Sequence, residues 1–161
     1  GYMIELKDTS ASLTLQNVVI DGARYSVAAE NAAETDSIIK AANGGTIVLN
    51  SGAILQNNKA AQFGSGILAN NGVNVTMEDG AIIRNNTNRN YELGGGILLG
   101  NGSTFTMNGG EISGNNKASS GGGVYLDNND GHARRRDLQQ QHLPDIWSGQ
   151  LRCRCLCCGL R

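Results

Sequence analysis

Short runs of alternating apolar and polar residues recur along the first 130 residues of the chain. In the most regular runs an apolar side chain occupies every second position, often with Thr between two of them. A period of two residues is typical of a β-strand with one buried face. The sequence therefore predicts strands whose inward set is Ile47, Leu49, Val75, Met77, Phe105 and Met107, and whose outward set is Val48, Thr76 and Thr106.

These runs belong to an internal repeat. When residues 38–58 are shifted by 28 positions, 9 of 21 meet an identical residue, and shifting residues 66–86 by 30 positions gives 11 of 21. Neither comparison needs a gap inside the block, so the variation in length falls in the connections between blocks. Constant blocks with variable connections are typical of a solenoid, because insertions are tolerated only where the chain leaves the stack.

Each block contains three β-like runs, separated by turn signals such as Asn-Gly. Residues 13–15 add an earlier coil at an offset of 34. We therefore predict an all-β fold, a parallel β-helix of about four coils of 28–30 residues with three short strands per coil. The strands of the best-defined block are predicted at Gly96–Leu99, Thr104–Met107 and Glu111–Ser113, and the third run is predicted to place Ile54, Ile82 and Ile112 in the core.

Asparagine recurs near the end of each block. We predict that Asn57, Asn85 and Asn115 lie at one turn of successive coils. Stacked amides bond one another along such an axis, and Asn tolerates the left-handed conformation of tight turns. Both explanations are structural, so we assign these residues no binding role.

The composition changes abruptly near Gly131. Residues 1–131 contain 7 basic and 12 acidic residues, whereas residues 132–161 contain 6 and 2 and hold all four Cys, both His, the only Pro and the only Trp. We predict two regions, a β-helix fragment over 1–131 and an aberrant basic, Cys-rich and disordered tail over 132–161. The acidic body gives no reason to expect nucleic acid, which needs clustered basic residues, and no apolar run has the ~18 residues of a membrane span.

A frameshift would explain the tail. If the codons for Asp137–His142 are read one nucleotide later, they permit Ile-Ser-Asn-Asn-Asn-Thr, which resembles the end of the preceding block. In that case the tail cysteines would not have been selected for any function. The spacing of Cys153, Cys155, Cys157 and Cys158 also lacks a second ligand cluster at zinc spacing, so we expect no metal and no cofactor.

Catalytic groups are sparse in the body. It has no His and no Cys, which excludes the usual nucleophilic triads there. Glu78 and Asp79 are adjacent and would point to opposite sides of a strand, and Arg84 is predicted to stack between Gln56 and Gly114, away from any acid cluster. A glycosidase needs two carboxyl groups on one face. We therefore expect this chain not to be an enzyme.

One stretch of surface remains as a candidate ligand site. If Ile67, Ile97 and Val124 face the core, then Leu68, Leu98 and Tyr125 stack outward as an apolar stripe. Exposed contiguous apolar surface often marks a partner site. The alternative is the reverse phase, in which the stripe is core, because both neighbours are apolar and periodicity does not decide between them.

The repeat resembles known bacterial families. Ile-x-x-Asn, followed shortly by a Gly cluster and then Ile or Val, resembles the paired motifs of polymorphic outer-membrane protein and autotransporter passenger repeats. In the outer-membrane family the first motif usually opens with Phe, where this chain has Ile. The resemblance implies a right-handed, pectin-lyase-like helix in a secreted or cell-surface bacterial protein. The three instances are Ile54–Asn57 with Gly64–Ile67, Ile82–Asn85 with Gly94–Ile97, and Ile112–Asn115 with Gly121–Val124.

Two functions remain open at this point. The first is a non-catalytic structural or adhesive module that presents loops or a strand face to a glycan or host-surface ligand. The second is a fragment of a polysaccharide lyase or glycosidase whose catalytic coils lie outside this chain. Ice binding is a third and remote interpretation, because Val48 interrupts the outward column of Thr14, Thr76 and Thr106. Open strand edges also favour edge-to-edge self-association.

Overall fold

The computed structural model is built from parallel strands. It describes residues 2–23, 36–60, 63–88, 93–115 and 121–127, and the predictions for the tail over 132–161 lie outside these residues. The first two coils hold β1 (Ile4–Leu6), β2 (Ser12–Leu15), β3 (Val18–Asp21), β4 (Ile39–Ala41), β5 (Thr46–Leu49), β6 (Ala53–Gln56) and β7 (Lys59–Ala60). The later coils hold β8 (Ile67–Ala69), β9 (Asn74–Met77), β10 (Ile82–Arg84), β11 (Thr87–Asn88), β12 (Ile97–Gly100), β13 (Thr104–Met107), β14 (Glu111–Ser113) and β15 (Val124–Asp127).

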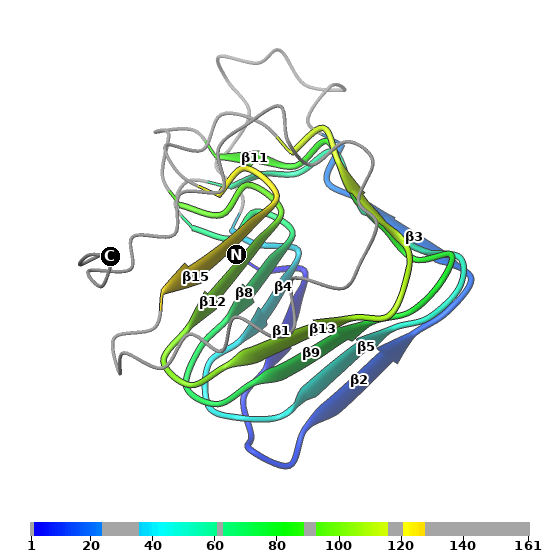
Figure 1. Ribbon diagram of the computed structural model, residues 1–161. Coiled ribbons are helices and arrows are strands. Elements are labelled where there is room, and N and C mark those ends of the chain that lie inside the picture. The colour runs from blue at the N-terminus through cyan, green and yellow to red at the C-terminus, as the bar shows by residue number, and fades with distance from the viewer. Residues whose placement is uncertain (1, 24–35, 61–62, 89–92, 116–120, 128–161) are drawn as a thin grey trace, which may run out of the picture.

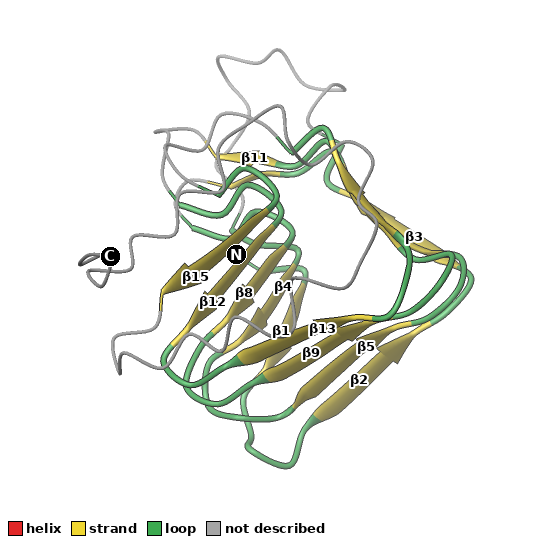
Figure 2. Cartoon of the chain, in the orientation of Figure 1, coloured by secondary structure: helices red, strands yellow, loops and turns green. Residues whose placement is uncertain are grey.

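Three parallel sheets wrap around one interior (Figures 1 and 2). Sheet A has the order β1-β4-β8-β12-β15, sheet B β2-β5-β9-β13, and sheet C β3-β6-β10-β14. Each strand pairs with its counterpart one coil away, and every strand pair in these sheets is parallel. This confirms the predicted all-β parallel β-helix of about four coils. A fourth, two-stranded ladder of β7 and β11 was not predicted, because it falls in a variable connection.

Sheet B has the predicted phase. Ile47 and Leu49 are fully buried and stack under Val75 and Met77, which are 1% and 0% exposed. The outward column joins Val48, Thr76 and Thr106 in register. Clean alternation made this strand the easiest to orient from the sequence.

The prediction for sheet C is wrong at two of three positions. Leu55 and Ile83 are fully buried and pair with each other, and Ile83 pairs in turn with Ile112, which is 7% exposed. Ile54 and Ile82 form the outward column and are half-buried. The cause is a connection that is one residue shorter in the last coil, so the register offset is 30 in sheet B but 29 in sheet C.

A buried asparagine ladder follows directly after sheet C. The Oδ1 atom of Asn86 accepts a hydrogen bond of 3.1 Å from the backbone N–H of Asn58, and Asn115 does the same for Asn86 at 2.9 Å. Their Nδ2 atoms donate to the backbone carbonyls of Leu55 and Ile83. The ladder thus satisfies backbone groups of neighbouring coils inside the stack, where an unpaired group costs about 1–3 kcal/mol.

Asn115 does not share the turn position of Asn57 and Asn85, contrary to the prediction. Asn57 and Asn85 each have a φ of 56°, and the matching position in the next coil is Gly114, with a φ of 60°. Asn and Gly are the residues that adopt this left-handed conformation at the lowest cost. Asn115 therefore belongs to the buried ladder, and its role is structural, as the sequence indicated.

Candidate ligand surfaces on the outer faces

The predicted apolar stripe lies on the outer face of sheet A. Leu98 pairs in register with Leu68 on one side and with Tyr125 on the other. Ile67 and Ile97 are fully buried in the core, so the reverse phase is excluded. Leu98 is only 6% exposed and Leu68 and Tyr125 are half-buried, so the accessible apolar surface is smaller than a fully exposed stripe would give. A ligand role for the stripe stays a prediction.

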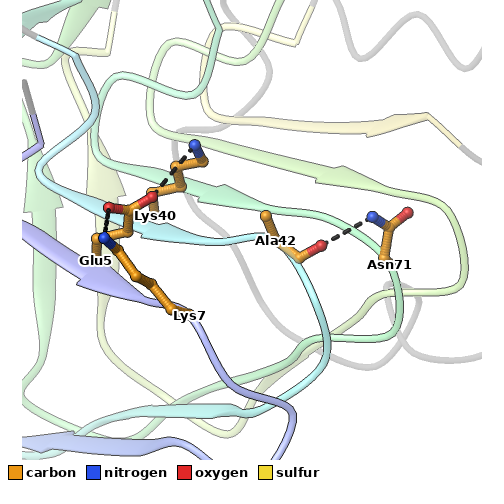
Figure 3. Close-up of polar contacts among 5 residues, drawn as sticks. All are labelled: Glu5, Lys7, Lys40, Ala42 and Asn71. Atoms are coloured by element: carbon orange, nitrogen blue, oxygen red, sulfur yellow. Dashed lines mark hydrogen bonds and ion pairs between the residues drawn. The ribbon is translucent and has the colours of Figure 1, made fainter.

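The same column becomes charged toward the first coil. Leu68 is followed by Lys40 and then by Glu5 in register. The Glu5 carboxylate lies 3.4 Å from the ammonium groups of both Lys7 and Lys40, as Figure 3 shows. The ammonium of Lys40 also lies 4.3 Å from the centre of the Tyr2 ring. A hydrogen bond to Tyr2 is the largest cause that raises the pKa of Lys40, so this side chain is held as a cation.

Hydroxyl groups line the outer face of sheet B. Two outward columns run across the four coils, and neither contains a charged residue. The Thr104 hydroxyl donates a hydrogen bond of 2.8 Å to Asn74 Oδ1, so this face has a side-chain link between neighbouring coils. Threonine is also favoured at exposed strand positions for its conformation alone. The columns are Ser12, Thr46, Asn74 and Thr104, and Thr14, Val48, Thr76 and Thr106.

Sheet C carries a polar ladder that the sequence analysis missed. Arg84 pairs in register with Gln56 and Ser113, not with Gly114. Its Nε atom donates to Gln56 Oε1 at 2.8 Å, and Gln56 Nε2 donates to Asp21 Oδ2 at 2.6 Å. Arg84 is therefore linked through Gln56 to a single acid two coils away, a contact that was not predicted. Only the offset of 35 between Asp21 and Gln56 would have revealed this, and it spans a long connection.

The electrostatics of the ladder follow from its hydrogen bonds. The backbone N–H of Ala23 donates to Asp21 Oδ1 at 2.7 Å and is the first cause that lowers the pKa of Asp21. Hydrogen bonds from Asn57 and Gln56 and the charge of Arg84 lower it further, while burial opposes them. The carboxylate is thus held ionised at neutral pH.

The carboxylates of the described residues are dispersed. Glu5 lies on β1 of sheet A, Asp21 ends β3 of sheet C, and the adjacent Glu78 and Asp79 follow β9 of sheet B. On sheet C, Asp21 and Glu111 lie on the two outermost strands, three strand spacings or roughly 14 Å apart. Glycosidases need two carboxyl groups about 5–9.5 Å apart. Within the described coils no group of three or more His, Cys, Asp or Glu side chains is placed to hold a metal ion, and the tail cysteines lie outside them.

The two ends of the stack leave inward-facing residues incompletely covered. Leu13, Leu15 and Ile20 of the first coil are only partly buried, whereas their counterparts in the middle coils are fully buried. At the other end the same holds for Val124 and Leu126. Partly covered apolar rows beside strand edges favour association. Self-association remains a prediction.

Comparisons with known proteins gave no match to this chain. No family model matches it, and neither the curated proteins nor the solved structures contain a match. In the part of the chain that the structure describes, no helix is long and apolar enough to cross a membrane.

Proposed function

We propose that this chain is a non-catalytic structural and adhesive module of a secreted or cell-surface bacterial protein. In this role the stacked coils form a rigid spacer, and an outer strand face presents side chains to a glycan or host-surface ligand. The resemblance of the repeat motifs to bacterial surface-protein repeats motivates the location.

The observation that carries the proposal is the set of polar links between coils on the outside of the stack. Asn101 donates to Asn71 at 3.3 Å, and Asn108 donates to Glu78 at 2.9 Å. Together with the Thr104 and Arg84 links, they join side chains of successive coils at the turns as well as on the strand faces. A surface whose side chains are already ordered loses less conformational entropy on binding.

The dispersed carboxylates favour adhesion over catalysis for the described coils. Asp21 and Glu78 each accept hydrogen bonds from neighbouring amides, so both are engaged within the fold. A catalytic site needs groups that converge on one point.

Binding of the full-length chain to a panel of polysaccharides and matrix proteins, measured by biolayer interferometry, tests the proposal. The same polysaccharides are assayed for new reducing ends and for unsaturated uronate products. We expect saturable binding to at least one ligand without product release. Product release would support the enzymatic alternative, and the absence of binding to any ligand would contradict an adhesive role.

A paired substitution tests the sheet A stripe within that experiment. Tyr125→Ala removes the one aromatic side chain of the stripe, and Phe63→Ala removes an exposed aromatic side chain that lies outside the three sheets. If the stripe is the contact, Tyr125→Ala weakens binding and Phe63→Ala does not. Equal effects of the two would contradict the assignment to sheet A.

A further inference from the structure

The polar ladder on sheet C holds one arginine in a fixed position. Asp21 Oδ2 accepts from Gln56 Nε2 at 2.6 Å and from Asn57 Nδ2 at 2.8 Å, and Gln56 Oε1 accepts from Arg84 Nε at 2.8 Å. The bonds between Asp21 and Gln56 and between Gln56 and Arg84 join residues that the parallel register pairs. Chains of hydrogen bonds of this kind strengthen one another, so the guanidinium is oriented by two coils beneath it.

Most of the hydrogen-bonding capacity of this arginine remains for a ligand. A guanidinium has five N–H donors in a planar fork, and the bond to Gln56 uses only the Nε–H. No described acidic side chain lies within ion-pair distance of Arg84, and it is the only cation on the four strands of sheet C. The two Nη groups have the geometry that a carboxylate matches with two parallel hydrogen bonds.

An aliphatic column runs beside the ladder. Val19, Ile54 and Ile82 face outward in register, and each lies two residues before a member of the ladder. Val19 is 55% exposed, and the other two are half-buried. An apolar strip next to ordered amide and charged groups suits a sugar, because a sugar ring has a C–H face and a rim of polar groups.

The charge around Arg84 selects among anionic ligands. Asp21 lies two strands away in the ladder, and Glu111 pairs with Ile82 on the neighbouring strand. One cation between two acids disfavours a ligand that carries several charged groups on one sugar unit, because such a ligand needs clustered basic residues. A polysaccharide with one carboxylate per sugar unit fits a single arginine that is flanked by acids.

We propose that the outer face of sheet C binds a uronate-containing polysaccharide, with one sugar carboxylate on Arg84 and the sugar ring over Ile54 and Ile82. The assignment rests on the adhesive function proposed above and names its ligand class and its contact. Gln56 and Asp21 are positioning residues, because they act through Arg84.

Isothermal titration of the full-length chain with polygalacturonate tests the inference. Arg84→Gln is expected to weaken binding roughly tenfold or more, because two charge-assisted hydrogen bonds are lost. Lys7→Gln removes the same charge at the end of β1, where the side chain is 79% exposed, and should leave the affinity within about twofold. Fully methyl-esterified polygalacturonate should bind no better to the parent than to Arg84→Gln, because it has no carboxylate.

The outcomes separate the inference from the proposed function. Equal binding of polygalacturonate by the parent and Arg84→Gln, with both folded by circular dichroism, would overturn the inference and leave glycan adhesion standing. Equal losses in Arg84→Gln and Lys7→Gln would reduce the effect to net charge and would also overturn it. Failure of the parent to bind any polysaccharide or matrix protein would contradict the proposed function itself.

Discussion

The phase of the third strand is tested by two adjacent substitutions, Ile83→Asp and Ile82→Asp. Ile83 is fully buried and lies between Leu55 and Ile112 in the inward column of sheet C. Truncation of such a side chain alone costs about 2–5 kcal/mol, and a buried carboxyl group without a partner adds several more. A small domain has a total free energy of unfolding of roughly 5–15 kcal/mol, so Ile83→Asp should abolish the fold.

Ile82 is the matched control because it differs only in the side of the strand that it occupies. It is half-buried on the outer face, beside Ile54 and Glu111. Ile82→Asp loses part of one side chain's apolar burial and some strand propensity, at a cost of about 1 kcal/mol. Ile82→Asp should therefore remain folded, with a modestly lower Tm.

Thermal and urea unfolding followed by far-ultraviolet circular dichroism measures both variants. Ile83→Ala and Ile82→Ala extend the comparison to variants that stay folded, with expected losses of about 2–5 kcal/mol and below about 1.5 kcal/mol. The reasoning is refuted if Ile82→Asp unfolds the protein while Ile83→Asp keeps a cooperative transition near that of the parent.

Three further predictions follow from the stacked coils. Asn86→Ala should lower the free energy of unfolding by about 2–4 kcal/mol in urea titrations, because it leaves buried backbone groups of neighbouring coils unpaired, whereas Gln16→Ala at an exposed position should change it by less than about 0.5 kcal/mol. Gly96→Ala should lower the Tm sharply, because a Cβ at this position would lie 2.5 Å from the backbone oxygen of Gly123 in the next coil. Gly123→Ala should leave the Tm nearly unchanged, because the nearest atom to its Cβ would be 3.4 Å away. Equal effects of the two substitutions would contradict the stacking. The pKa of Asp21 is lowered from its ordinary value of 3.8, so the stabilising contribution of this carboxylate is present above that pH and is lost as the pH falls below it. Asp21→Asn should therefore flatten the dependence of Tm on pH between about 4 and 2. An unchanged slope would contradict the ladder.

The repeat was sufficient to predict the architecture. Identical residues at fixed offsets, with length variation confined to connections, require equivalent positions in successive coils. Sheet B was also predicted in detail, because Thr76 between two apolar residues leaves only one phase. These are properties of local pattern, and they need no knowledge of distant contacts.

Sheet C could not be oriented in the same way. Ile82 and Ile83 are both apolar, as are Ile54 and Leu55, so a period of two gives no preference. The ungapped alignment then matched Ile82 with Ile112 and concealed the one-residue difference between the two connections. In the structure hydrogen bonding decides the register.

The candidate sites depended on the same kind of information. The sheet A stripe was found because its members share one position of the repeat. The ladder of Asp21, Gln56 and Arg84 was missed because three different residue types occupy one position, and the first of them precedes a long connection. A column of unlike residues leaves no repeat signal in a single sequence.

The most direct test of the account is a disulfide cross-link between adjacent coils. In a background in which the four tail cysteines are replaced by Ser, Ile82→Cys and Glu111→Cys are introduced together, because these positions are paired neighbours on the outer face of sheet C. Paired strand positions lie within the Cα separation of 4.4–6.8 Å that a disulfide requires. The account predicts rapid intramolecular cross-linking of this pair, detected by the loss of free thiols and by peptide mass mapping. Cross-linking of Ile82→Cys with Ile112→Cys instead, or of neither pair, would contradict the stacked register.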